Sequence, residues 1–366
     1  MTHGARGYEE YEEPEDDGFF DDESEQPQRR KKRRGPLFVL FMVCILVLLI
    51  PVLLLSFYAG RGFLAINSIE RDSSLTPTEY EGRPAPAAPK PDNPEGPAPI
   101  NFVLMGSDAR GSERGRSDSL MVAHITGDRK HVYLISFPRD MWVEVPGRGK
   151  AKINAAYSWG GPALTVRTLE NLLDVRMDHT VGIDFEGFIN LTQAVGGVTV
   201  HNPWASSSNG YSFKEGELTL QGEEALVYVR ERYNLPNGDL DRAYRQRTVV
   251  KGIIRQLATP ETLTNPARFN DVVGQVADTL AVDDQMTNSY ITELGMSMRI
   301  TGTDGVRMLQ APITGFATIQ GQSVDVVDFG RIKMLSDSLK SDTMDFYFES
   351  YGKDNYAKLP QVDPPE

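Results

Sequence analysis

Two aspartates flank a loop that is rich in glycine and arginine. Residues 106–118 read GSDARGSERGRSD and include Asp108, Arg116 and Asp118. The apolar segments on either side predict antiparallel neighbouring strands, which would hold both aspartates at the base of one loop. Such a pair of carboxylates suits a divalent cation, Mg²⁺ or Mn²⁺, because these ions prefer oxygen ligands. The alternative is structural, with the carboxylates capping turns and pairing with arginines.

A third predicted strand brings another arginine to the same place. The three strands are expected at residues 100–106, 119–126 and 131–137. The polar turn 127–130 joins the second and third as a hairpin, so the third strand ends at the same sheet edge as the first. Arg139 and Asp140 follow directly. This edge of an α/β sheet commonly binds ligands, and Arg116 and Arg139 would both face a ligand there.

A second group of cationic side chains lies in residues 228–247, which read YVRERYNLPNGDLDRAYRQR. If the beginning of this segment is a strand, Arg230 and Arg232 face the same way, because side chains alternate along a strand. If a helix begins at Asp239, Arg242 and Gln246 share its stripe with the apolar residues that follow.

A guanidinium on the buried stripe of a helix needs an anion, because an unpaired buried charge is unfavourable. The planar fork of arginine suits phosphate or carboxylate. A phosphorylated ligand would satisfy this requirement. The alternative is an internal ion pair of Arg242 with Asp239, Asp241 or Asp140.

Several other classes of protein are excluded by composition and spacing. The five histidines show no zinc spacing, and no nucleophile elbow or P-loop is present. The chain has a formal net charge of −13, of which −4 lies in residues 1–35, so the remainder carries −9. That balance argues against nucleic acid as a partner, since a nucleic-acid binder normally presents a basic face.

Residues 36–60 contain no charged side chain and are long enough to cross a bilayer of about 30 Å as one helix. The sequence RRKKRR at 29–34 precedes them. A cationic run beside a membrane span stays in the cytoplasm. We therefore expect a single-pass membrane protein with a cytoplasmic N-terminus and the C-terminal bulk outside.

The chain divides into five parts by composition. They are a disordered acidic cytoplasmic tail (1–35), a transmembrane helix (36–60), a proline-rich linker (61–99), an α/β domain (100–351) and a loose tail (352–366). Helices are expected at residues 161–173, 185–195, 239–258, 266–280 and 287–298.

The sequence resembles the LytR-CpsA-Psr family of bacterial cell-wall enzymes. The resemblance rests on NFVLMGSDAR, GRSDSLMVAHI, SFPRDMWVEVPG, KINAAYSWGG, AVGGVTV and LVYVRERYNLPNGDLDRAYRQR, which occur in the family's order. It implies a three-layer α-β-α domain with a mixed central sheet, held outside the bacterial cell membrane by the N-terminal span. It also implies a phosphotransferase that moves a glycopolymer from a polyprenyl-pyrophosphate carrier to a hydroxyl of peptidoglycan and leaves a phosphodiester.

The resemblance also implies roles for individual residues. Asp108 and Asp118 match the metal-binding carboxylates. The residues that match the pyrophosphate-contacting set are Arg116, Arg230, Arg232, Arg242 and Gln246, and Asp239 matches an acid of the same motif. Lys152 lies in the KINAAY motif and, with Arg139, is expected to line the substrate site.

Three other functions remain open from the sequence. A membrane-anchored sensor that binds phosphorylated polyprenyl lipid would need the arginines but no metal. A pyrophosphatase would use the same groups with water as the acceptor. A transcriptional attenuator is disfavoured by the outward topology and by the −9 balance.

Overall fold

The computed structural model describes residues 69–90, 93–107, 117–257, 276–300, 304–352 and 359–364. The chain separates into two units, Met1–Leu53 and Leu54–Glu366, and all elements below belong to the second. The expected tail and transmembrane segment lie outside the described residues. Within the described ranges, no helix is both long and apolar enough to cross a membrane.

A mixed seven-stranded sheet forms the centre of the domain. Its strands, in spatial order, are β1 (Glu70–Arg71), β12 (Ala281–Val282), β7 (His179–Ile183), β2 (Ile100–Ser107), β3 (Ser117–Ile125), β4 (Val132–Ser136) and β13 (Val306–Gln310). Strands β2, β3 and β4 are antiparallel neighbours, whereas β7 pairs with β2, and β13 with β4, in parallel. The three predicted strands and their hairpin are therefore confirmed.

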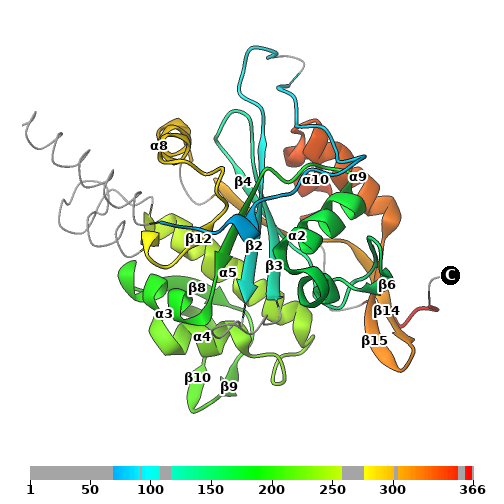
Figure 1. Cartoon of the computed structure of the whole chain (residues 1–366). Coiled ribbons are helices and arrows are strands. Elements are labelled where there is room, and N and C mark those ends of the chain that lie inside the picture. The colour runs from blue at the N-terminus through cyan, green and yellow to red at the C-terminus, as the bar shows by residue number, and fades with distance from the viewer. Residues whose placement is uncertain are drawn as a thin grey trace, which may run out of the picture. The chain divides into compact units, whose positions relative to one another are not determined.

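Helices cover both faces of this sheet, so the domain has three layers (Figure 1). One face packs against α2 (Asn154–Leu173), α9 (Phe329–Lys340) and α10 (Met344–Tyr351). The other packs against α5 (Asp239–Leu257) and α8 (Asn288–Ser297), and α3 (Phe185–Ala194) and α4 (Gly222–Arg230) lie beyond. The short strands outside the sheet are β5 (Trp142–Val145), β6 (Gly149–Lys152), β8 (Val198–Asn202), β9 (Ser206–Ser208), β10 (Tyr211–Phe213), β11 (Gly216–Leu220), β14 (Ile313–Ile319) and β15 (Gln322–Val327).

Side chains alternate along each strand, so the two faces of the sheet pack into two separate hydrophobic cores. In β4, Tyr133 and Ile135 pack with α2 and α9, whereas Val132 and Leu134 pack with α5 and α8. All four side chains are buried. A strand buried on both faces reads as a continuous apolar run, as β4 does.

The segment 228–233 is not a strand, and this prediction is wrong. Most of it belongs to α4, which ends at Arg230, and Arg232 lies in the loop that follows. The run LVYV is short and apolar, so periodicity alone does not distinguish a buried strand from a buried helix. Glu223 and Glu224 in the first turn and Arg230 in the last complement the dipole of the helix.

The predicted helices at 185–195, 239–258 and 287–298 correspond to α3, α5 and α8. Helix α2 begins at Asn154 and has a kink at Gly161. The predicted helix at 161–173 corresponds to the part that follows this kink. Gly161 has a φ of 66°, which glycine adopts without strain, and Pro162 starts the second part of the helix. The helix expected at 266–280 lies largely outside the described residues.

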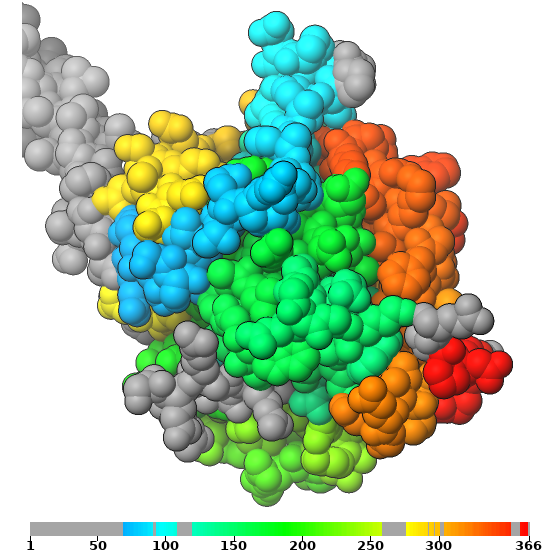
Figure 2. Space-filling model, turned by 45° about the vertical axis from the view of Figure 1, so that its right-hand side comes forward, coloured from blue at the N-terminus to red at the C-terminus, as the bar shows by residue number. Residues whose placement is uncertain are grey.

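Part of the segment expected to be a linker packs against the domain. Strand β1 extends the sheet, and the short 3₁₀ helix η1 (Ser73–Leu75) follows it. Arg83 donates to both carboxylate oxygens of Glu170 on α2, which also accepts from the Tyr80 hydroxyl at 2.9 Å. Figure 2 shows this segment in blue, lying against the green residues of the domain.

Candidate functional site

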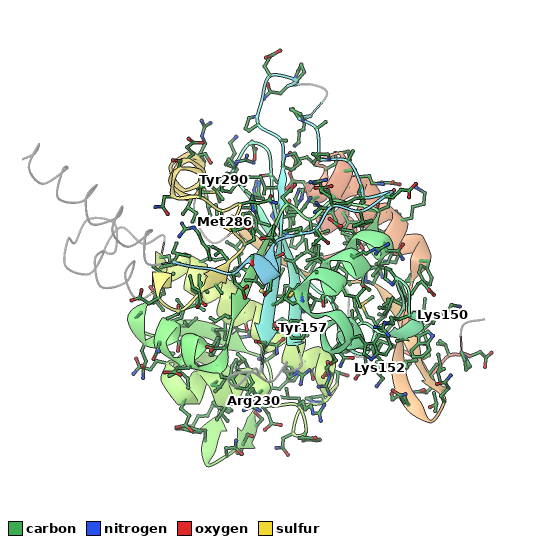
Figure 3. The ribbon with its side chains drawn as sticks, in the orientation of Figure 1. Lys150, Lys152, Tyr157, Arg230, Met286 and Tyr290 are labelled. Atoms are coloured by element: carbon green, nitrogen blue, oxygen red, sulfur yellow. The ribbon has the colours of Figure 1, made fainter. Side chains whose placement is uncertain are left out.

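Four parallel strands end at one edge of the central sheet. Strands β2, β7, β4 and β13 run in the same direction, so their C-terminal ends meet there. Asp184 follows β7 closely, and Arg139 follows β4. In Figure 3, Arg230 and Lys152 lie toward this lower end of the domain, whereas Met286 and Tyr290 lie toward the opposite end. The sheet therefore has one edge suited to ligands, as the sequence predicted.

The predicted metal ligands are only partly described. Asp108 and Arg116 lie outside the described residues. Asp118 belongs to β3, at a register shift next to the pair Gly106 and Ser119, and its side chain is not described. In the ranges that the structure describes, no group of three or more His, Cys, Asp or Glu side chains is placed to hold a metal ion.

Five of the other predicted residues line an apolar cavity of about 680 Å³. Its walls come from the sheet, α3 and α5, and include Leu104, Ala123, Leu134, Val181, Phe188, Val250, Ile254 and Leu257. The polar side chains in the wall include those of Arg139, Arg230, Arg232, Arg242 and Gln246. Four guanidinium groups therefore border a space whose interior is aliphatic and aromatic.

A carboxylate holds two of these arginines. Asp239 Oδ1 lies 2.6 Å from Arg242 Nη2 and 3.2 Å from Arg139 Nε. The guanidinium of Arg230 lies over the Phe185 ring, 4.4 Å from its centroid. The internal ion pair between Arg242 and Asp239 is thus present, and it leaves Arg242 in the wall of the cavity.

The remaining two predicted side chains have weaker supports. The guanidinium carbon of Arg232 lies 4.6 Å from the centroid of the Tyr233 ring. Tyr233 itself is 83% exposed. Gln246 donates to the backbone oxygen of Val229 at 3.4 Å. Arg232 also donates to the Tyr233 hydroxyl at 2.5 Å.

The KINAAY motif positions the loop that carries Arg139. The backbone N–H of Asn154 donates to the Arg139 oxygen at 3.2 Å, and that of Ile153 donates to the Met141 oxygen at 2.8 Å. Lys152 Nζ lies 2.9 Å from Asp140 Oδ1. Lys152 thus approaches the arginine cluster through Asp140, and it is not among the residues that line the apolar cavity.

Two carboxyl groups near the arginines, one half-buried and one buried, have raised pKa values. Burial raises the pKa of Asp239, although Arg242 and Arg139 oppose the shift. Asp325, on β15, was not predicted from the sequence. It is 6% exposed, and burial, followed by the charges of Asp140 and Asp239, raises its pKa to about 7. Its N–H donates to the Asp140 oxygen at 2.9 Å, which brings β15 against the loop that carries Arg139.

Arg245 lies between two site residues in sequence but has a structural role. It is fully buried and donates to Asn202 Oδ1, the Trp204 oxygen and Ser206 Oγ at 2.9 to 3.1 Å. Its guanidinium also lies 4.2 Å from the centroid of the Tyr228 ring. These contacts tie α5 to the segment that follows β8.

The site has the form expected for an amphipathic anion. Guanidinium groups favour phosphate and carboxylate, and an apolar cavity favours a hydrocarbon chain. A site of this form suits an anionic group attached to an apolar chain. The chain belongs to the LytR_cpsA_psr family, whose model matches residues 62–341.

Relatives named as transferases share part of this sequence. The polyisoprenyl-teichoic acid–peptidoglycan teichoic acid transferase TagU of Bacillus licheniformis is 40% identical over 188 residues, which are 51% of this chain and 61% of that protein. The chain thus spans less than two thirds of this relative. TagU of Halalkalibacterium halodurans is 37% identical over 236 residues, covering 61% of this chain and 78% of that protein.

Solved structures share the fold. The crystal structure of B. subtilis TagV superposes with a TM-score of 0.58 at 29% identity, covering 67% of this chain and 97% of that one. A structure of TagT bound to LI-WTA has a TM-score of 0.53 at 25% identity and covers 67% of this chain and 90% of that one. These structures support the mixed α/β architecture described above.

Proposed function

We propose that the protein is a phosphotransferase of cell-wall assembly. It would move a glycopolymer from a polyprenyl-pyrophosphate carrier to a hydroxyl of peptidoglycan and form a phosphodiester. The observation that carries this proposal is the presence of four arginines in the wall of an apolar cavity, which suits a pyrophosphate attached to a polyprenyl chain. The names of the TagU relatives agree with this reaction.

The reaction requires that negative charge be stabilised where it develops. The acceptor oxygen forms a bond to the phosphorus that carries the glycan, and the bond from that phosphorus to the bridging oxygen breaks. Polyprenyl phosphate leaves with the bonding electrons. Arginines that are already in position stabilise the charge on the phosphate oxygens without further reorganisation. We assign this role to Arg230, Arg232 and Arg242, together with Arg116 and with Arg139 and Gln246 as binding groups.

The hydroxyl proton must also be removed. The Asp239 carboxyl group lies beside Arg139 and Arg242, and burial raises its pKa above the ordinary value of an aspartate, although both arginines oppose the shift. Asp239 would act either as this base or by orienting Arg242. Lys152 would contribute positive charge through its contact with Asp140.

We further propose that Asp108 and Asp118 hold Mg²⁺ or Mn²⁺. The paired ends of β2 and β3 bring the two ends of the intervening loop together, and carboxylate oxygens are the donors that these ions prefer. A bound ion would supply charge neutralisation at the phosphate oxygens. Replacing both aspartates with alanine should abolish metal-dependent turnover while circular dichroism still shows a folded domain. Full activity of this double variant would refute the assignment.

The cellular location follows from the proposed anchor at residues 36–60. The protein would be a single-pass protein of the bacterial cell membrane with its N-terminus in the cytoplasm. A reporter that is active only outside the cytoplasm, fused after Glu366, should be active. A signal from a reporter that requires the cytoplasm would reject this location.

The decisive experiment uses defined substrates. The protein is incubated with a synthetic polyprenyl-pyrophosphate sugar, Mg²⁺ and peptidoglycan fragments, and the products are identified by mass. Polyprenyl phosphate together with a sugar-phosphate diester of the fragment would establish transfer. Polyprenyl phosphate together with free sugar phosphate, and no diester, would establish a pyrophosphatase. Tight binding without any product would establish a sensor.

A further inference from the structure

A second cavity, of about 840 Å³, lies at the outer edge of strand β13. This strand is at the end of the sheet, and β4 is its only partner among the described strands. Residues 306–313 all contribute to the cavity wall, although successive side chains of a strand face opposite sides. The wall is therefore the edge of the strand rather than one of its faces. We call this cavity the edge groove.

The backbone of β13 has hydrogen-bonding groups directed into the edge groove. The Gly305 oxygen accepts from Val132, and the Ala311 N–H donates to Ser136, so these groups point toward β4. Since direction alternates along a strand, the backbone groups of Val306, Met308 and Gln310 point away from β4. A row of such groups is a template for an extended peptide, which adds to a sheet edge as a further strand.

The edge groove is cationic in a chain whose formal net charge is −13. Its lining contains four basic side chains and one acidic side chain, namely Arg247, Lys251, Arg307, Arg331 and Asp304. Arg307 is already held by Asp345 and by the Tyr133 hydroxyl. We therefore expect it to attract an anionic ligand by its charge rather than by a direct hydrogen bond. Lys251 is half-buried, and burial, followed by the charge of Arg255, lowers its pKa, although the charge of Asp304 opposes the shift.

Aromatic rings stand on both sides of the edge groove. Trp204 and Tyr244 make an edge-to-face contact on one side, with ring centroids 5.4 Å apart. Phe348 and Tyr351 stand on the other. Aromatic surfaces of this kind pack against the apolar faces of sugar rings. The groove thus combines groups that suit peptide backbone, carboxylate and sugar.

Helix α5 separates the edge groove from the apolar cavity. Arg242, Gln246 and Val250 line the apolar cavity, whereas Tyr244, Arg247 and Lys251 line the edge groove. At about 100° per residue these two sets lie on opposite sides of the helix. The two spaces approach each other at the beginning of α5, where Asn237 lines the groove two residues before Asp239.

We propose that the edge groove binds the acceptor, a glycan strand that carries short carboxylate-bearing peptides. The peptide would lie along β13, with its carboxylates near Lys251 and Arg331 and with sugar rings against the aromatic walls. The glycan would extend toward Asn237 and Asp239. This proposal rests on the proposed transferase function, because it assigns the second substrate of that reaction. A peptide-free donor polymer would leave the edge of β13 unused, which favours the acceptor as the occupant.

The test compares two charge reversals in the full-length protein in detergent. Lys251→Glu places an acid in the edge groove, and Lys333→Glu makes the same change on an exposed part of α9 outside it. The ligand is a peptidoglycan disaccharide with its stem peptide, and its dissociation constant is measured by calorimetry. Lys251→Glu should weaken binding by roughly three- to tenfold, and Lys333→Glu should leave it unchanged. Lys251→Gln, which removes the charge without reversing it, should give a smaller loss.

Three outcomes would overturn the proposal. The first is an equal effect of both reversals, or no effect of either. The second is equally tight binding of the same disaccharide without its peptide. The third is that a glycerol-phosphate oligomer binds more tightly than the peptide-bearing disaccharide and that Lys251→Glu weakens the binding of this oligomer. The donor is tested separately by the rise in melting temperature that polyprenyl pyrophosphate causes in the unchanged protein. No rise would refute the proposed function, whatever the edge groove binds.

Discussion

Asp239 Oδ1 lies 2.6 Å from Arg242 Nη2, one turn further along α5. The same oxygen lies 3.2 Å from Arg139 Nε, on the loop after β4. One carboxylate therefore holds cations from two separate elements, and both cations line the apolar cavity. This arrangement keeps both guanidinium groups in position before the ligand arrives.

The first prediction concerns this contact. If Asp239 acts by orienting Arg242, the effects of Asp239→Asn and Arg242→Lys on kcat/KM should not add, because both changes disrupt one unit. We expect each single variant to lose roughly tenfold or more, and the double variant to be no worse than the poorer single variant. Steady-state release of polyprenyl phosphate measures this. Additive losses would instead indicate that Asp239 acts independently, as a base.

The second prediction separates binding arginines from structural ones. Arg230→Lys keeps the charge but loses the planar fork, so it should weaken donor binding by roughly 1 to 3 kcal/mol per lost charged hydrogen bond. Its melting temperature without ligand should be unchanged, because Arg230 contacts the Phe185 ring in the cavity wall rather than a network.

Arg245→Lys is the matched comparison. It removes contacts to Asn202, Trp204 and Ser206, so it should lower the free energy of unfolding by about 1 to 3 kcal/mol. The folded fraction should bind the donor normally. Thermal melts and donor titrations on both variants test this division of roles. A loss of stability in Arg230→Lys together with a loss of donor affinity in Arg245→Lys would contradict it.

The third prediction tests the apolar cavity. Ala123 lines it, so Ala123→Leu should occupy space that the polyprenyl chain needs. Affinity should fall for a long-chain donor and stay the same for a short-chain pyrophosphate. The melting temperature without ligand should change little. By contrast, Ala156→Leu adds the same volume to the tightly packed core on the other face and should cost about 1 to 3 kcal/mol. Equal loss of short- and long-chain donors would show that the chain lies elsewhere.

The fourth prediction concerns pH. The pKa of Asp325 is about 7 in the folded protein and 3.8 as its ordinary value, so the folded state favours the protonated form. Protonated Asp325 therefore stabilises the folded state relative to ionised Asp325. This contribution to the free energy of unfolding is complete below about pH 4 and is lost as the pH rises toward 7. Asp325→Asn lacks this dependence. The variant's melting temperature minus that of the unchanged protein should therefore rise between pH 4 and 7 and then level off. A constant difference across this range would show that Asp325 titrates normally.

The sequence predicts those helices and strands whose apolar residues follow either the helical or the strand period. Strands β2, β3 and β4 are apolar runs bounded by turn residues, and α5 continues a helical stripe from Asp239 to Leu257. The spacing of residues predicts Arg139 in one group and Arg230, Arg232 and Arg242 in another, and only the family resemblance places all four in one site, where the structure has them lining one cavity. The interpretation of α4 as a strand is wrong. Arg230 and Arg232 reach the same cavity because the chain leaves the helix between them.

Other parts of the site left no usable signal in the sequence. Leu104 and Leu134 line a cavity, but an apolar side chain in a cavity and one in a filled core have the same pattern along the chain. Asp325 comes near Asp140 only through the pairing of β15 with distant segments. A single acid within the apolar strand QSVDVV is a hint of such a contact, but it does not identify the partner.

The attachment of Arg83 to Glu170 and of β1 to the sheet shortens the tether of the domain. A free linker of 39 residues (61–99) would have a contour length of up to about 140 Å. Because packing against the domain already begins near Glu70, only about 30 Å of chain separates it from residue 60, where the proposed anchor ends. If residues 36–60 anchor the chain as proposed, this short connection would confine the domain to a thin layer next to the bilayer. The proposed polyprenyl donor would then always be within reach, whereas the proposed acceptor would have to approach the domain.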